Sequence, residues 1–450
     1  MSNDLPASSP SAPSSWRSAV RGNVLMMGLV SLLTDFSSEM INPILPIFFA
    51  YLAGGAEAAL WVGLSEGIAE TTASLLKIFS GRISDRLGKR KALVIVGYGL
   101  SAVCRPAMAL VGAGFAGAAQ VVGLKFGDRV GKGIRTSPRD ALIGDSVGPD
   151  VRGLEFSFHR AMDHMGAVLG PLAVIVILYA FLGYARWGKQ SAQGVITGEE
   201  AGAIRWLFGV ALVPGVLAVL ALIFKVREIA PPPAASHHKA DVTRFGVWGQ
   251  LPRRFYAFVG VVTLFALGNS SDMFLLLLGW KLFGLGLVPL VTLWIALHVS
   301  KILFSIPGGL LSDKLGRRPV IVAGYVMYAL VYLGMAHVSH LWQFVALFVA
   351  YGFYYGMTEG AEKALVTDFV PSEHRGTAFG IFHGAIGLAA LPASLIFGVL
   401  WTVLERVQEG LGARVAFSIG AALAGLAAVL MLVLLSTSRR APAGAEVSRR

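Results

Sequence analysis

The chain has 450 residues, of which 55% are hydrophobic and only 14% charged, and its formal net charge is +12. Because a soluble domain carries about 25% charged residues, this composition argues against a water-soluble enzyme or binding domain and favours a protein whose outer surface faces lipid. The Lys and Arg in excess fall mostly between the apolar runs, which argues against nucleic-acid binding, and the single cysteine, Cys104, excludes an intramolecular disulfide.

The chain begins with a segment rich in Ser, Pro and Ala, which predicts a disordered cytoplasmic N-terminus at residues 1–21. This segment lacks the charged region, short apolar core and cleavage site of a secretory leader. We therefore expect the first apolar run to be a resident helix.

Twelve apolar runs follow, each near the length of about 20 residues that a membrane-spanning helix needs. A polar stretch that contains three consecutive prolines, Pro231 to Pro233, separates the first six runs from the last six. The runs lie at residues 22–50, 60–80, 91–112, 115–146, 155–183, 204–224, 254–280, 287–311, 319–337, 341–369, 376–401 and 414–435.

The number and order of these runs predict an all-α integral membrane protein with twelve transmembrane helices in two six-helix bundles. Lys and Arg concentrate in the segments on the same side as the two chain ends, so the positive-inside rule predicts a multi-pass protein of the cell inner (plasma) membrane with both termini in the cytoplasm. The predicted parts are an N-terminal bundle at 22–224, a cytoplasmic linker at 225–253, a C-terminal bundle at 254–437 and a cytoplasmic tail at 438–450.

The two halves of the sequence share three short motifs in the same order. The two copies of each motif are separated by nearly the same distance along the chain, which indicates an internal repeat of the kind that is typical of secondary transporters. The paired segments are Ser37–Met40 with Ser270–Met273, Gly81–Arg90 with Gly309–Arg318, and Ala141–Asp145 with Ala364–Asp368.

The segment Gly81–Arg90, together with its second copy, resembles the signature loop of the major facilitator superfamily, and the resemblance covers essentially residues 20–437. It implies a fold of two pseudo-symmetric bundles that rock about a central cavity and expose it alternately to each side of the membrane. It also implies that the working unit is a monomer that moves a small molecule.

The signature loop itself predicts a conformational latch. Its glycines permit a tight turn, and Asp85 can pair with a neighbouring arginine or cap a helix N-terminus in one conformation and release it in another. The simpler alternative is a topology signal with surface charges. The residues of the predicted latch are Gly81, Asp85, Arg86, Gly88, Arg90, Asp313 and Arg317.

Charged residues inside apolar runs are functional candidates, because a charge at the bilayer centre costs about 2.5–3.5 kcal/mol on insertion scales. Asp35 and Glu39 share one face of the first run near mid-depth, and Asp272 holds the corresponding place in the seventh run. Burial disfavours the charged form of a carboxyl group, which suits these residues to proton or substrate coupling. The alternative is that they neutralise a buried cation. Glu66 and Glu70 in the second run are weaker candidates at the mouth of the cavity.

The fourth run is unusually rich in charge. Its segment Arg129–Gly133 is similar to the R-x-x-Q-G pattern of the family, with Lys132 in place of the glutamine. The resemblance therefore makes Arg129 a candidate for coupling.

The tenth run adds the coupling candidates Glu359, Glu362 and Lys363. In the repeat, Glu362 and Lys363 correspond to Arg139 and Asp140 of the fourth run, with the signs of charge exchanged. We expect these residues to form salt bridges on the cytoplasmic side, within or between the bundles.

Gly166, Gly170 and Pro171 in the fifth run look like the G-x-x-x-G-P element of proton-linked exporters, so the resemblance favours antiport. In the same run, His159 and Asp163 share a helix face and form a candidate proton relay, because an imidazole changes its charge near neutral pH. The histidines and methionines of this run also fit a copper site. Packing or pairing explains them more simply, and we predict no metal.

The motifs of common enzyme classes are absent from the sequence, including the phosphate-binding G-x-x-x-x-G-K-[ST] that would indicate ATP as the energy source. We expect a secondary active transporter without a cofactor, which moves a small molecule through the lipid bilayer with protons as the coupling ion, and we favour efflux by antiport. One alternative is a proton-coupled importer of a small solute, a metal or a metal chelate. Another is a non-transporting membrane sensor, which predicts few cavity charges and a large domain outside the membrane.

Overall fold

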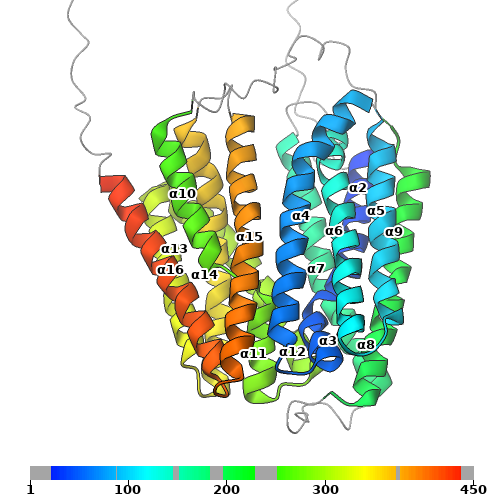
Figure 1. Ribbon diagram of the computed structural model, residues 1–450. Helices are drawn as coiled ribbons and strands as arrows, with labels where there is room; N and C mark the ends of the chain where they lie inside the picture. Colours follow the sequence, from blue (N-terminus) through cyan, green and yellow to red (C-terminus); the bar gives the residue numbers. More distant parts are fainter. Residues whose placement is uncertain are drawn as a thin grey trace, which may run out of the picture.

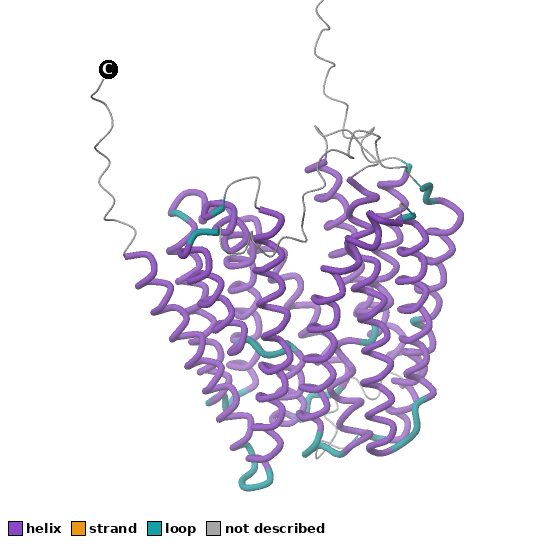
Figure 2. Tube along the Cα trace, turned by 45° about the horizontal axis from the view of Figure 1, so that its top comes forward, coloured by secondary structure: helices purple, strands orange, loops and turns teal. Residues whose placement is uncertain are grey.

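The computed structural model describes residues 22–87, 89–144, 152–182, 196–228, 251–370 and 375–436. Within these ranges the regular structure is entirely helical, which confirms the predicted fold class. The helices stand in two bundles side by side (Figure 1), and short loops connect many of them (Figure 2).

Each predicted apolar run of the first half forms between one and three successive helical elements. The elements of this first bundle are α2 (Asn23–Glu39), η1 (Asn42–Ile44), α3 (Leu45–Ala53), α4 (Ala58–Leu87), α5 (Arg90–Ala107), η2 (Met108–Leu110), α6 (Gly114–Gly144), α7 (Arg152–Leu182), α8 (Gly198–Val210) and α9 (Leu212–Lys225).

The second bundle follows the same plan. Its elements are α10 (Arg253–Gly268), α11 (Met273–Phe283), α12 (Leu287–Leu315), α13 (Arg317–Ala336), α14 (Leu341–Phe369), α15 (Arg375–Glu405) and α16 (Leu411–Ser436). Helices α10 and α11 together occupy the seventh predicted run, as α2 and α3 occupy the first.

The helix ends define two sides of the molecule. Helix α9 ends and helix α10 begins on one side, which we call the linker side, and α2 begins and α16 ends there as well (Figure 1). The opposite side, which we call the far side, carries the turn between α3 and α4 and the turn between α15 and α16.

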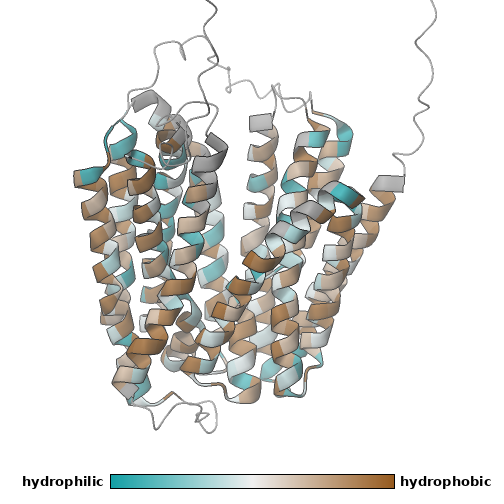
Figure 3. Cartoon of the chain, turned by 180° about the vertical axis from the view of Figure 1, so that it is seen from behind, coloured by the Kyte–Doolittle hydropathy of each residue, from teal (hydrophilic) through white to brown (hydrophobic). Residues whose placement is uncertain are grey.

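Nine helical segments among the described residues are long and apolar enough to cross a membrane. Figure 3 shows hydrophobic residues along much of the length of the helices. Helices α4, α6 and α14 are not among the nine, because charged and polar side chains lie along them. The prediction of twelve spans depends on adding these three helices.

The first helix of each bundle is broken at the same place in the repeat. Helix α2 ends at Glu39 and the chain resumes in η1 and α3, while α10 ends at Gly268 and α11 begins at Met273. In the first bundle, Pro43 lies inside the break, where its missing N–H does not interrupt a regular helix. Both breaks adjoin the repeated Ser-Ser-acid-Met motif, so the acidic residue of each copy lies where the helix is interrupted.

The two bundles contact each other mainly along α4 and α15, and α7 packs against α12. Gly67 on α4 allows a close approach, because a Cβ at this position would lie only 2.9 Å from Leu391 Cδ1. The Leu60 backbone N–H donates to Thr402 Oγ1 at 3.1 Å, and Thr71 Oγ1 donates to the Gly387 carbonyl at 2.7 Å. These contacts close the far side and extend to mid-depth.

The predicted latch is only partly described. Gly88 and the side chains of Asp85, Arg86 and Asp313 lie outside the described residues. In the second copy, Arg317 Nε lies 3.1 Å from Asp368 Oδ2, so this loop is tied to the end of α14. The role of these residues as a latch stays a prediction.

Candidate functional site

A cavity of about 420 Å³ lies between the bundles at the depth of the two helix breaks. One wall comes from α2, α4, α5 and α6 and carries most of the charge, and the other comes from the second bundle. The lining residues are Asp35, Ser38, Glu39, Asn42, Glu66, Glu70, Arg105, Arg129, Lys132, Arg135, Asn269, Ser270, Ser271, Asp272, Met273, Trp294, Tyr355, Ala390 and Ser394.

The charged wall contains ion pairs that link α4 to α6. Lys125 on α6 is buried and donates to Glu66 on α4. One turn further along, Arg129 Nη1 lies 3.6 Å from Glu70 Oε1 and its Nε lies 3.9 Å from Asp128 Oδ2. Glu66 is therefore a paired and buried residue of the cavity wall, and Glu70 is paired there although its side chain is 46% exposed.

Arg105 on α5 extends the same network toward α2. Its Nε lies 3.0 Å from Asp128 Oδ1, although the two atoms are not aligned for a hydrogen bond, and its Nη1 donates to the Thr34 carbonyl at 2.8 Å. Both Arg105 and Asp128 are buried. Because buried charges must be paired, this network fixes α2, α5 and α6 relative to one another.

Two charged side chains of this wall stand apart from the network. Asp35 on α2 and Lys132 on α6 are half-buried and line the cavity. Among the described residues, neither side chain has a hydrogen-bond or ion-pair partner. A ligand in the cavity therefore meets one carboxylate and one ammonium that have no hydrogen-bond or ion-pair partner in the described part of the chain.

Glu39 has a different environment, because its hydrogen-bond donors are neutral. Asn42 Nδ2 donates to Glu39 Oε1 at 2.9 Å, and Trp294 Nε1 donates to Glu39 Oε2 at 2.8 Å. Asn42 belongs to the first bundle and Trp294 to α12 of the second. The carboxyl group of Glu39 thus joins the two bundles inside the cavity.

Asp272, the counterpart of Glu39 in the repeat, is neutralised by a cation. Lys301 Nζ lies 2.8 Å from Asp272 Oδ2, and the hydroxyl groups of Tyr351 and Tyr355 donate to Asp272 Oδ1 at 2.7 and 3.3 Å. The Lys301 ammonium also lies 3.9 Å from the centre of the Tyr355 ring. These contacts all lie within the second bundle.

A cluster of tyrosines supports this second wall. The Tyr328 hydroxyl donates to the Gly268 carbonyl at 3.0 Å, and the Tyr332 and Ser270 hydroxyl oxygens are 3.4 Å apart. The Tyr328 hydroxyl thereby satisfies a backbone carbonyl at the break between α10 and α11. The members of the cluster are Tyr325, Tyr328, Tyr332, Tyr351, Tyr354 and Tyr355.

The candidates of the tenth run do not line the cavity. Lys363 Nζ lies 2.7 Å from Glu359 Oε1 on the same helix, and Glu362 accepts a hydrogen bond from the Tyr325 hydroxyl at 2.9 Å. In the first bundle, Arg139 Nη2 lies 2.8 Å from the adjacent Asp140. In the described part of the chain, the ion pairs Arg139–Asp140 and Glu359–Lys363 each lie within one bundle, and Glu362 makes a hydrogen bond in place of the expected salt bridge.

The glycines of the fifth run contact the helix that carries Asp35 and Glu39. A Cβ at Gly166 would lie 2.9 Å from Asp35 Cβ, and a Cβ at Gly170 would lie 3.2 Å from Glu39 Cβ. Pro171 lies inside α7, one residue later. The two glycines thus form a close contact between α7 and α2 behind the cavity wall.

His159 and Asp163 lie in the contact between α7 and α2. His159 Nδ1 is 3.5 Å from Asp163 Oδ2, and Ser31 on α2 donates to the Asp163 carboxylate. Neither residue lines the cavity. Groups of three or more His, Cys, Asp or Glu side chains that could hold a metal ion are not found in the described part of the chain.

Several residues of the site were not among the sequence candidates. Arg105, Lys125 and Asp128 are charges inside apolar or helical runs, so the rule that selected Asp35 and Glu39 could have selected them too. Trp294 and Tyr351 carry no such signal, because an aromatic residue in a membrane helix is ordinary.

The family model described as Major Facilitator Superfamily matches residues 27–300 and 278–450. An uncharacterized MFS-type transporter of Methanocaldococcus jannaschii is 34% identical over 418 residues, which cover 92% of this chain and 94% of that protein. A multi-drug resistance efflux pump of Streptococcus pneumoniae is 28% identical over 134 residues, which cover 30% of this chain and 32% of the pump.

The fold also matches solved structures. The crystal structure of a bacterial homolog of the human lysosomal transporter Spinster, in an inward-facing and occupied conformation, aligns with a TM-score of 0.72 at 17% identity and covers 96% of this chain and 100% of that chain. At this identity the likeness shows a common fold.

Proposed function

The chain belongs to the major facilitator superfamily and is a multi-pass membrane transporter and not an enzyme, and on this basis we propose that it exports a small molecule in exchange for protons. The observation that carries the proton coupling is the position of Glu39. Its carboxyl group lies in the cavity, and within the described ranges it accepts from two neutral donors, one from each bundle.

Protonation of Glu39 changes the contact between the bundles. A carboxylate is a stronger acceptor than a neutral carboxyl group, so a proton on Glu39 weakens the hydrogen bond from Trp294. Proton binding and the contact between the bundles therefore compete, which is what proton-driven alternating access requires.

We assign substrate binding and a second proton-binding step to Asp35 and Lys132. Both line the same cavity as Glu39, and neither charge has a direct partner among the described residues. Arg129 holds Glu70 and Asp128 in place and keeps the charged wall intact. Asp272 is held by Lys301, so we assign it to positioning of the break between α10 and α11.

The direction and orientation are part of the same proposal. The glycine contact between α7 and α2 is the element that resembles proton-linked exporters, and a segment of the chain is similar to a multidrug efflux pump. We place the linker side in the cytoplasm of a cell whose inner membrane contains the twelve spans, with residues 22–224 and 254–437 as the two moving units and a monomer as the working unit. The far-side contacts then define an inward-facing state.

Proton flux in proteoliposomes that contain a trapped pH-sensitive dye tests the proposal. Amphiphilic drugs, organic acids and metal chelates are added to the wild type, to Glu39→Gln, to Asp35→Asn and to Glu199→Gln. The last variant removes an exposed carboxylate at the start of α8, outside the cavity, and serves as the matched control.

We expect a compound to trigger proton movement in the wild type and in Glu199→Gln, and this movement to be lost in Glu39→Gln. Movement of the compound without protons would contradict the coupling. Uptake driven by an inward proton gradient would replace export by import. No movement of any compound by a folded protein would favour the membrane sensor.

A further inference from the structure

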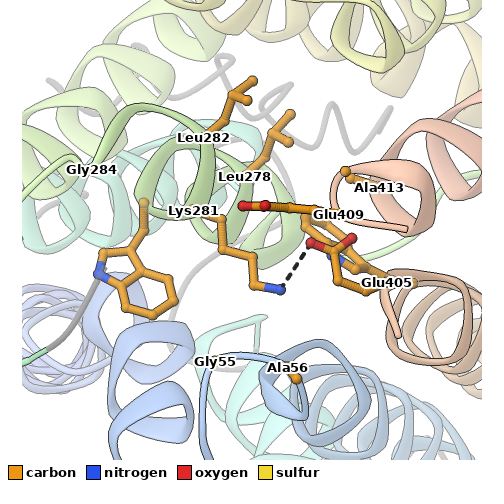
Figure 4. A pocket seen from close by; sticks show the side chains of 12 residues that line it. Gly55, Ala56, Leu278, Lys281, Leu282, Gly284, Glu405, Glu409 and Ala413 are labelled. Carbon is orange, nitrogen blue, oxygen red and sulfur yellow. Dashed lines mark hydrogen bonds and ion pairs between the residues drawn. The ribbon is translucent and has the colours of Figure 1, made fainter. Parts of the chain in front are cut away.

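A second pocket, of about 460 Å³, lies on the far side between the bundles and shares no lining residue with the central cavity. The first bundle contributes Gly55 and Ala56 from the turn between α3 and α4. The second bundle contributes residues of α11, of α15 and of the turn that leads into α16 (Figure 4). The ion pair of Glu57 and Arg406 joins the bundles beside it.

The walls of this far-side pocket are mostly apolar. Leu278, Leu282 and the ring of Trp280 come from α11, and the ring of Trp401 comes from α15. Pockets of a few hundred Å³ with such walls and a few polar groups are typical of small-molecule sites.

The charged groups of the pocket leave one negative charge in excess. Glu405 and Glu409 point into the same space as Lys281 (Figure 4). Lys281 Nζ lies 3.5 Å from Glu405 Oε1, which is at the long end for a hydrogen bond. Glu409 is exposed and has no hydrogen-bond or ion-pair partner among the described residues. A cationic ligand is therefore favoured over an anionic one.

Two residues that line the pocket each carry a buried polar atom that has no partner among the described residues. Trp401 is 1% exposed, and its Nε1 donor has no acceptor in the described part of the chain. Glu405 Oε2 is a buried acceptor that likewise lacks a donor there. A buried donor or acceptor that makes no hydrogen bond costs free energy. Trp401 Nε1 and Glu405 Oε2 together therefore favour a ligand that can both accept and donate a hydrogen bond.

We propose that the far-side pocket binds a protonated amino alcohol with an apolar body. Its ammonium group donates to Glu405 Oε2 and is attracted by Glu409, its hydroxyl oxygen accepts from Trp401 Nε1, and its apolar part packs against the indole and leucine side chains. Because the pocket is made by both bundles, the bound ligand stabilises the closed far side and slows alternating access.

Calorimetric titration of the purified full-length protein in detergent tests this site, with phenylethanolamine, phenethylamine and phenylpropionate as probes. Phenylethanolamine and phenethylamine share a body and an ammonium group and differ by one hydroxyl, and phenylpropionate carries a negative charge. We expect phenylethanolamine to bind about three- to tenfold more tightly than phenethylamine, the range that one net hydrogen bond gives. We expect no binding of phenylpropionate in the far-side pocket.

Variants locate the bound probe. Trp401→Phe removes the donor and should make the two amines bind equally, and Glu409→Gln should weaken both at least threefold. Glu199→Gln, an exposed carboxylate outside the pocket, should bind as the wild type does, and Asp35→Asn reports any binding of the amines in the central cavity. Thermal unfolding of each variant shows that it is folded.

Loss of binding in Asp35→Asn with wild-type binding in Glu409→Gln would place the amine in the central cavity and overturn the proposal. Equal binding of all three probes would overturn it as well. The titration does not depend on transport, so failure of the proton-flux experiment leaves it unaffected.

Discussion

The two walls of the central cavity come from the same repeat but stabilise it by different chemistry. Glu39 and Asp272 both adjoin a break in the first helix of their bundle. Around Glu39 lie the ion pairs of α4, α5 and α6, whereas around Asp272 lie one lysine and a cluster of tyrosines. The repeat has kept the backbone break and changed the side chains around it. A ligand in the cavity therefore meets charges on one wall and hydroxyl and aromatic groups on the other.

The largest effect is expected from breaking the charged wall. In Glu66→Gln, the buried ammonium of Lys125 loses its counter-charge. Removing one partner of a buried pair costs about 3–5 kcal/mol, so we expect a loss of that size in the free energy of unfolding. The reactivity of the buried Cys104 with a thiol-specific dye, measured during denaturant titration, reports it.

The double variant Glu66→Met with Lys125→Met provides the control, because it removes both charges. It should regain most of the lost stability. A cost below about 1 kcal/mol for Glu66→Gln alone would mean that water already solvates this pair.

The second largest effect is expected from the glycine contact between α7 and α2, behind the charged wall. In Gly170→Ala, the added Cβ would lie 2.6 Å from the Phe36 carbonyl oxygen, so α7 must move away from α2 and from Glu39. Overpacking of this kind costs about 1–3 kcal/mol, and we expect a comparable loss in the free energy of unfolding together with weaker proton movement. Gly123→Ala on α6, where nothing lies within 4 Å, is the matched control. Equal behaviour of the two variants would show that the helix contact does not position Glu39.

A smaller effect is expected at the tyrosine wall. Tyr351→Phe removes the 2.7 Å hydrogen bond to Asp272, and Tyr355→Phe removes the 3.3 Å one, while Lys301 remains in both variants. We expect Tyr351→Phe to lower the free energy of unfolding by about 1.5 kcal/mol and Tyr355→Phe by less. The same Cys104 assay measures both. A larger loss of stability in Tyr355→Phe than in Tyr351→Phe would mean that the shorter hydrogen bond to Asp272 is not the stronger one.

The smallest effect is expected away from both walls. Glu359 and Lys363 pair along one helix, but their side chains are 51% and 37% exposed. Exposed pairs of this spacing contribute about 0.3–0.5 kcal/mol, so Glu359→Gln should leave the free energy of unfolding nearly unchanged. Proton movement in the liposome assay decides its role, because Glu359 was a coupling candidate from the sequence. A loss of proton movement with unchanged stability would restore it as one.

The sequence predicts the helical fold well because the thickness of a membrane sets the length of an apolar helix that can cross it. It also places Asp35, Glu39 and Asp272 at the cavity, because charges in apolar runs must face an interior. It does not predict what they contact. Trp294 is 255 residues from Glu39 in the chain, and nothing in its neighbourhood marks it as a donor. Arg139 and Glu362 exchange signs in the repeat, yet each pairs within its own bundle. The sequence reports the two charges but not the distance between the bundles, so it could not decide between pairs within and pairs across the bundles.

The hydrogen bond from Trp294 to Glu39 makes ligand binding a competition. A ligand that takes the carboxylate of Glu39 as its acceptor must first displace the indole N–H, and a bond to a charged acceptor contributes about 1.5–3 kcal/mol. Its apparent affinity is lowered about ten- to a hundredfold by this displacement. In return, the occupied cavity has lost a link between the bundles. The cavity then selects molecules that can replace the indole N–H of Trp294 at the carboxylate of Glu39. Binding of such molecules is weaker because this displacement costs free energy.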